Sequence, residues 1–207
     1  MSEQQLLPSR GLPAVAETQI FEPAGRAIPY IDEGEGPTSL ILIPERGLDG
    51  DALGVIAHYL AEEAGFRIVR IGSRSDADGS ETAGAMSERA DDAAAVIDHL
   101  DLGGSWIGGH GTGGTVARAV AAGHSDRVNG LLLLAVEDEQ IPLPSSMPVL
   151  IIQGTHDAIT PPANGERLQS TASDRASIAA IDRGDHLFPM THPVETAVII
   201  EEYLDWD

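Results

Sequence analysis

Three segments of the sequence hold the side-chain types that acid–base chemistry needs. They are a glycine-rich turn, 109-GHGTGG-114, and two polar segments, 154-GTHDAITPP-162 and 183-RGDHLFPMTHP-193. The second segment offers the carboxylate of Asp157 and the third the imidazole of His186. Side chains of these two kinds are common general acids and bases in enzymes. Because each segment follows an apolar run, the surrounding elements decide what these groups can do.

Short apolar runs alternate with amphipathic stretches along most of the chain. The apolar runs predict strands over 17–22, 27–32, 39–44, 67–71, 105–108, 130–136, 148–153 and 176–181. The amphipathic stretches predict helices over 53–61, 84–101, 114–122, 163–171 and 193–204. Strands that alternate with helices predict an α/β fold, a doubly wound and mostly parallel sheet with helices on both faces. We expect one domain over residues 17–207 after a flexible tail over residues 1–16.

In a doubly wound sheet, the loops that leave the carboxyl ends of the strands carry the functional residues. The glycine-rich turn and the two polar segments are all predicted to be loops of this kind. The predicted fold therefore gathers them at one edge of the sheet.

The charge of the chain limits its partners. The sequence has 33 acidic residues against 12 basic ones, a formal net charge of −21, and every basic residue is an arginine. Such a chain is repelled by nucleic acid and by anionic membrane surfaces, so neither is an expected partner. A solvated acidic surface and adaptation to high salt both account for this composition.

The sequence also limits the compartment and the cofactors that are expected. There are no cysteines, which excludes disulfides, thiolate metal sites and a cysteine nucleophile. The N-terminus has no basic segment followed by an apolar one, and no apolar run is long enough to span a membrane, so a cytoplasmic protein is expected. The seven histidines are scattered and form no H-E-x-x-H pair, so we expect no metal and no cofactor. The sequence makes no prediction of oligomeric state.

Dinucleotide binding is a weaker alternative for the glycine-rich turn. Gly109, Gly111 and Gly114 do satisfy G-x-G-x-x-G between a predicted strand and a predicted helix. However, that fingerprint normally follows the first strand of its domain, whereas other strands precede it here. Dinucleotide binding would also leave the acid and histidine segments unexplained. A Walker-type nucleotide site is disfavoured because the chain has no lysine.

Taken in order, these segments resemble the α/β-hydrolase superfamily, in its branch of small esterases and lipases. The turn resembles the G-x-S-x-G elbow, and 148-PVLIIQGTHDAITPP-162 and 184-GDH-186 resemble the acid and histidine loops. The likeness runs from about Ile20 to the C-terminus. It implies the order nucleophile, acid, histidine, which falls on Gly111, Asp157 and His186.

Two positions depart from the pattern of the family. Gly111 stands where the nucleophilic serine is expected, and glycine keeps the strained turn while removing the hydroxyl. The oxyanion loop reads 44-PERG-47 instead of His-Gly-x-Gly. The resemblance implies the backbone amides of Arg46 and Thr112 as oxyanion donors, beside a Glu45 carboxylate that would oppose an oxyanion.

Two further residues flank the tip of the turn. His110 precedes the tip of the turn and is expected to be a packed or hydrogen-bonded pocket residue. Thr112 follows the tip, and a nucleophilic role for its hydroxyl is disfavoured because the elbow fixes direction as well as position.

These observations predict a hydrolase relative that acts on small ester-type substrates without the usual serine. Only about a dozen residues separate Val136 from Val149, where the family inserts a lid, so an open site is expected. The protein would be degenerate or would use the His186–Asp157 pair as a general base. A serine replaced by glycine to trap a substrate is also compatible with the sequence. The alternative is a non-catalytic protein that binds a small ligand, and whether the chain is an enzyme stays open.

Overall fold

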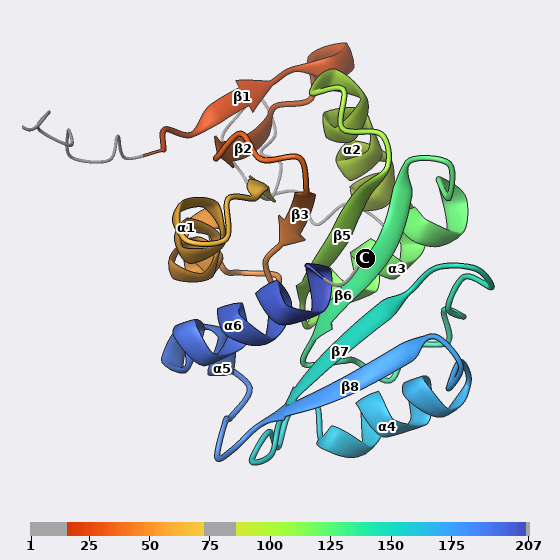
Figure 1. Cartoon of the computed structure of the whole chain (residues 1–207). Coiled ribbons are helices and arrows are strands. Elements are labelled where there is room, and N and C mark those ends of the chain that lie inside the picture. Colours follow the sequence, from red (N-terminus) through yellow and green to blue (C-terminus); the bar gives the residue numbers. More distant parts are fainter. Residues whose placement is uncertain (1–15, 73–85, 206–207) are drawn as a thin grey trace, which may run out of the picture.

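The computed structural model describes residues 16–72 and 86–205 (Figure 1). The predicted tail over residues 1–16 lies outside the described residues except for Ala16. Within the described ranges, no helix is long and apolar enough to cross a membrane.

Eight strands of the described chain form one sheet, in the order β1-β2-β4-β3-β5-β6-β7-β8. The strands are β1 (Gln19–Phe21), β2 (Ile28–Glu33), β3 (Ser39–Ile43), β4 (Arg67–Ile71), β5 (Ser105–His110), β6 (Val128–Leu134), β7 (Val149–Gly154) and β8 (Ala176–Ile181). The pairings β1–β2 and β2–β4 are antiparallel, and the other five are parallel. The prediction of a mostly parallel sheet is therefore confirmed.

Helices cover both faces of the sheet. They are α1 (Gly54–Glu62), α2 (Met86–His99), α3 (Thr112–Gly123), α4 (Pro162–Ser170), α5 (Phe188–Thr191) and α6 (Pro193–Leu204), with short 3-10 helices at Pro23–Gly25 and Gly50–Leu53. One core packs α2 and α3 against the sheet, and the other packs α1 and α6 against its opposite face (Figure 1). Among the α-helices of the described chain, the short helix α5 is the one that the sequence pattern did not predict; the two 3-10 helices were not predicted either.

The central strands are buried on both faces, as their continuous apolar runs indicate. In β3, Ile41 and Ile43 belong to the core under α2 and α3, whereas Leu40 and Leu42 belong to the core under α1 and α6. All four side chains are almost completely buried. This alternation is typical of a parallel strand between two helical layers.

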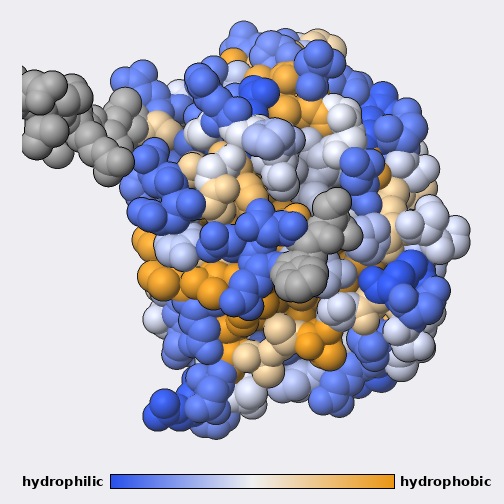
Figure 2. All heavy atoms as spheres, in the orientation of Figure 1, coloured by the Kyte–Doolittle hydropathy of each residue, from blue (hydrophilic) through white to orange (hydrophobic). Residues whose placement is uncertain are grey.

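The exterior is strongly polar. Figure 2 shows hydrophilic residues over most of the visible face, with hydrophobic residues between them. At the carboxyl edge of the sheet, residues 135–148 connect β6 to β7 without a helix or strand. No lid domain is therefore inserted between these two strands, as the length of the segment predicted.

Candidate active site

The turn between β5 and α3 has the geometry of a nucleophile elbow without a nucleophile. Gly111 has φ 52° and ψ −119°, a left-handed conformation that strains any residue with a side chain. The helix that follows packs very closely, because a Cβ added at Gly113 would lie 2.1 Å from the carbonyl oxygen of Ile43. Glycine at both positions lets the turn lie against the loop after β3.

The acid and histidine loops bring Asp157 and His186 into contact. Asp157 follows β7 and His186 follows β8, and both side chains are buried. The Asp157 Oδ2 atom lies 3.0 Å from His186 Nδ1. Because a carboxylate only accepts, the imidazole must donate from Nδ1, which leaves Nε2 for the reacting side of the ring.

Asp157 is fixed by further hydrogen bonds from its own loop. Its Oδ1 atom accepts from the backbone amides of Ile159 and Thr160, both at 2.8 Å, and its Oδ2 accepts from the Thr160 hydroxyl at 2.6 Å. Burial alone would raise the pKa of Asp157, but the hydrogen bonds from Thr160, His186 and Ile159 outweigh it and lower the pKa. Asp157 is therefore an ionised carboxylate held in a fixed orientation.

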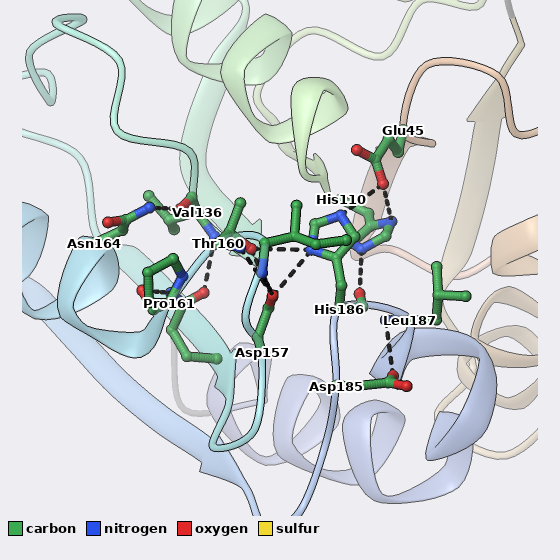
Figure 3. Close-up of polar contacts among 12 residues, drawn as sticks. Glu45, His110, Val136, Asp157, Thr160, Pro161, Asn164, Asp185, His186 and Leu187 are labelled. Atoms are coloured by element: carbon green, nitrogen blue, oxygen red, sulfur yellow. Dashed lines mark hydrogen bonds and ion pairs between the residues drawn. The ribbon is translucent and has the colours of Figure 1, made fainter.

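Glu45 occupies the space that a side chain at position 111 would need. A Cβ built on Gly111 would lie 3.0 Å from both Cδ and Oε1 of Glu45. The Glu45 Oε2 atom lies 2.8 Å from Nε2 of His186, on the side of the ring opposite Asp157. Figure 3 shows the resulting row of Asp157, His186 and Glu45, with Thr160 beside the acid. The loop after β3 thus supplies the side chain that the elbow lacks.

The two carboxylates set the protonation of His186. Burial alone would lower the pKa of His186, yet the hydrogen bonds to Asp157 and Glu45 together with their negative charges raise it above its ordinary value. When the pH equals the ordinary histidine pKa or lies somewhat above it, the His186 imidazole therefore still carries a proton on each nitrogen. In this state it is a proton donor toward Glu45.

His110 lies against the same group. Its ring is completely buried, its Nε2 lies 2.7 Å from the backbone carbonyl oxygen of His186, and the two imidazole rings are 4.8 Å apart. Burial lowers the pKa of His110, reinforced by the positive charge of His186, although the hydrogen bond to the His186 carbonyl and the Glu45 charge act the other way. His110 is therefore a neutral histidine beside the site.

The resemblance assigns two backbone amides to an oxyanion hole, those of Arg46 and Thr112, and they differ in their hydrogen-bond partners and in their place in the fold. The Arg46 amide donates a hydrogen bond of 2.7 Å to the Thr112 hydroxyl. Thr112 is the first residue of α3, where backbone amides lie at the positive end of the helix. The hydroxyl of Thr112 therefore engages one of the two expected donors from within the protein.

Sequence reasoning gathered most of these residues but missed two relationships. Thr160 was not singled out, although its place three residues after Asp157, before two prolines that open α4, is typical of a side chain that caps a loop. The contact between Glu45 and Gly111 joins two loops that are distant in the sequence. No local pattern could have found it.

One group of side chains could hold a metal ion. Glu45, His110 and His186 each offer one ligand atom, and these atoms all lie within 4.8 Å of one another. The three residues come from the loops after β3, β5 and β8, so they form no short motif in the sequence.

A family model described as the alpha/beta hydrolase family matches residues 85–188, half of the 207 residues. The chain belongs to the alpha/beta hydrolase family. The matched region contains the elbow, the acid loop and most of the histidine loop, and together with the fold it indicates a hydrolase-type protein.

One relative of this alpha/beta hydrolase is an acetyltransferase component of an enzyme system. The chain is 29% identical over 120 residues to the dihydrolipoyllysine-residue acetyltransferase component of the acetoin cleaving system of Pseudomonas putida. The alignment spans 56% of this chain but 32% of that protein, about a third of its length. The likeness therefore concerns one part of a longer protein.

Solved structures of hydrolases share the fold of this chain. An esterase from Thermogutta terrifontis matches with a TM-score of 0.80 at 20% identity, covering 92% of this chain and 98% of that one. A meta-cleavage product hydrolase from Pseudomonas fluorescens matches with a TM-score of 0.79 at 16% identity, covering 90% and 97% of the two chains. At these identities the matches confirm the α/β-hydrolase fold.

Proposed function

We propose that this hydrolase-type protein cleaves small ester-type substrates by activating water directly, without a serine nucleophile and without an acyl-enzyme. The observation that carries the proposal is the position of Glu45. Its carboxylate fills the space of a side chain at position 111 and lies 2.8 Å from His186 Nε2. A carboxylate there can accept a proton from water, as the histidine ring of a serine hydrolase accepts one from the serine.

The two groups divide the proton transfers between them. Glu45 takes a proton from a water molecule as the water oxygen attacks the ester carbonyl carbon. Protonated His186, oriented by Asp157, gives its Nε2 proton to the departing alkoxide when the carbon–oxygen bond breaks. The proton on Glu45 then returns to His186 across their hydrogen bond, so the products are one acid and one alcohol and the site is restored.

The surroundings of the site favour small substrates. Residues 135–148 provide no lid to cover a long acyl chain. The Glu45 side chain is 23% exposed, so water and a small ester can reach it.

The test compares hydrolysis of a short-chain aryl ester by the chain and by three variants. Glu45→Gln keeps the shape of the side chain but removes the base, and His186→Ala removes the acid. We expect each to reduce kcat by about 100-fold, within the usual range for one general acid or base. The matched control is Glu63→Gln, a change of the same kind on an exposed residue. Turnover of Glu45→Gln at the rate of the unmodified chain would refute the proposal, as would a pre-steady-state burst of alcohol.

A second candidate function is binding of a small ligand without turnover. It is favoured by the hydrogen bond from the Arg46 amide to the Thr112 hydroxyl, because an engaged amide is less able to stabilise an oxyanion. Thr112→Val removes that acceptor while keeping the shape. If binding of a short carboxylic ester is saturable and no variant, Thr112→Val included, yields product, the binding function replaces the enzymatic one.

A further inference from the structure

We propose that Glu45, His110 and His186 form a binding site for one divalent transition-metal ion of the zinc type. The ligand atoms would be Oε2 of Glu45, Nδ1 of His110 and Nε2 of His186. Two imidazole nitrogens and one carboxylate oxygen make a ligand set suited to zinc and to its first-row neighbours. The three ligand atoms lie where a serine hydrolase has its nucleophile. The match to the family model does not by itself indicate a metal at this place.

The strongest observation is the unused nitrogen of His110. Its Nε2 lies 2.7 Å from a backbone carbonyl oxygen, which only accepts, so Nε2 must carry the hydrogen. In the neutral ring, Nδ1 then carries a lone pair. This atom is buried and has no hydrogen-bond partner among the described residues. A buried polar atom without a partner is costly, and a bound cation would satisfy it.

The nearest charged group makes a cation more favourable still. The Glu45 Oε2 atom lies 3.7 Å from Nδ1 of His110. Two electron pairs facing each other at that distance repel, whereas a positive ion between them attracts both. The same oxygen lies 2.8 Å from His186 Nε2, so the three ligand atoms converge from three loops.

The separations are close to those of a metal site. Tetrahedral zinc–nitrogen and zinc–oxygen bonds of about 2.0–2.2 Å put neighbouring ligand atoms about 3.3–3.6 Å apart. The separations from Glu45 Oε2 are 2.8 Å and 3.7 Å, and no pair of ligand atoms exceeds 4.8 Å. The Glu45 side chain is 23% exposed and can rotate, but a pair up to 4.8 Å apart closes on one ion only if the two buried histidine rings also shift toward each other.

Both histidines are already oriented as metal ligands are. His186 donates from Nδ1 to the Asp157 carboxylate at 3.0 Å, and His110 donates from Nε2 to a backbone carbonyl at 2.7 Å. A ligating histidine almost always gives its other N–H to a carboxylate or a carbonyl, which fixes the tautomer and the ring. The acid of the former triad thus acts as a positioning residue for the proposed site.

The proposed ion and the proposed water activation use the same atoms. Binding would release the proton shared by Glu45 and His186 and would leave open coordination positions for water, since only three protein ligands are available. The inference rests on the proposed function only for the use of the ion: an ion held by Glu45 and His186 would take that base and that acid out of use and would itself activate the water, so the two mechanisms belong to the metal-bound and the metal-free chain. Binding itself is measured without a substrate.

The experiment titrates the chelator-treated whole chain with zinc by calorimetry and with cobalt by visible absorption. We expect one zinc ion per chain with a micromolar or lower Kd, no magnesium binding under the same conditions, and cobalt bands typical of low coordination number. His110→Gln and Glu45→Gln should each weaken zinc binding by at least about 100-fold, since even outer-shell changes weaken it 10–100-fold. The control is His58→Gln, which removes an exposed histidine outside the group.

The outcomes separate this inference from the proposed function. Glu45→Gln is the decisive variant, because its half-buried side chain can change without disturbing the core, and thermal unfolding checks that His110→Gln folds. If zinc binds the unmodified chain no more tightly than it binds Glu45→Gln, or if His58→Gln loses as much affinity, the metal site is refuted. Zinc binding by a chain that hydrolyses no ester in either its metal-free or its zinc-bound form refutes the proposed function alone, and hydrolysis by a chain that fails to bind zinc refutes the metal site alone.

Discussion

The candidate active site has two halves, and only one of them has the side chains expected in a serine hydrolase. In the half formed by the loops after β7 and β8, Asp157 and His186 keep the contact expected in a serine hydrolase, at 3.0 Å. In the half formed by the loops after β3 and β5, the elbow carries no side chain and Glu45 fills its place. The comparison teaches that the turn keeps a positive φ at Gly111 while a carboxylate from a neighbouring loop lies beside it.

The difference follows from how each half is held. Asp157 is held by four hydrogen bonds, three from its own loop (one from Ile159 and two from Thr160) and one from His186. Removing it would leave buried donors without an acceptor. Glu45 is partly exposed and contacts the site mainly through its one carboxylate. Asp157 is therefore expected to contribute more to the stability of the fold than Glu45 does.

The largest expected effect tests that contrast in stability. Asp157→Ala should lower the free energy of unfolding by about 3–5 kcal/mol, because it removes one partner of a buried charge pair and leaves donors unsatisfied. Glu45→Ala should lower it by at most about 1 kcal/mol, as expected for a partly exposed ion pair. Urea unfolding of the two variants measures both. Equal losses in the free energy of unfolding would mean that Asp157 and Glu45 stabilise the fold to the same extent.

The next effect tests whether Glu45 is what blocks a serine. Gly111→Ser alone should stay inert, because its Cβ would lie 3.0 Å from the Glu45 carboxylate. Gly111→Ser combined with Glu45→Gly opens that space and returns Nε2 of His186 to the serine. We expect covalent labelling by a fluorophosphonate at least about 100-fold faster than for the single variant, the lower end of general-base catalysis. His186→Ala in the double variant is the control, and labelling that survives it would contradict the interpretation.

A smaller effect concerns the glycine that lets the two loops approach. Gly113→Ala would bring a methyl group to 2.1 Å from the Ile43 carbonyl oxygen, directly before the loop that holds Glu45. We expect a loss of about 1–3 kcal/mol in the free energy of unfolding, typical of overpacking. The displaced loop should also weaken ester hydrolysis. Gly123→Ala is the matched control, since nothing lies within 4 Å of a Cβ there.

The smallest expected effect is a pH dependence in the metal-free chain. His186 has a raised pKa, burial being outweighed by its bonds to Asp157 and Glu45. Its stabilising contribution is complete below the unfolded pKa of about 6.5 and is lost as the pH rises through the folded value. Stability should therefore fall from pH 6 toward pH 9, and less so in Glu45→Gln. Urea unfolding in the presence of chelator measures this, and identical slopes for the two proteins would exclude Glu45 as a cause.

The sequence predicted the fold well because its signals are local. Apolar runs such as 149–152 and the periodic helix after Gly111 are readable residue by residue, and they decide the order of strands and helices. The short helix α5 escaped because four residues are too few for a periodic pattern.

The site was predicted only in part, for the same reason. Gly111, Asp157, His186, His110 and Glu45 were all assigned to one region by their order along the chain. The resemblance could not say that Glu45 turns toward His186 or that Arg46 donates to the Thr112 hydroxyl. Those contacts depend on side-chain directions across separate loops, which no spacing in the sequence records.

The short approach between Glu45 and the missing Cβ of residue 111 also couples these two positions. A Cβ at position 111 would lie 3.0 Å from the Glu45 carboxylate, so the flexible end of Glu45 would have to shift to admit any side chain there. A serine introduced at position 111 would also adopt the strained backbone conformation of the turn, at a cost of about 1–3 kcal/mol, before its hydroxyl could form a hydrogen bond. The effect of any substitution at position 111 is therefore expected to depend on the residue at position 45.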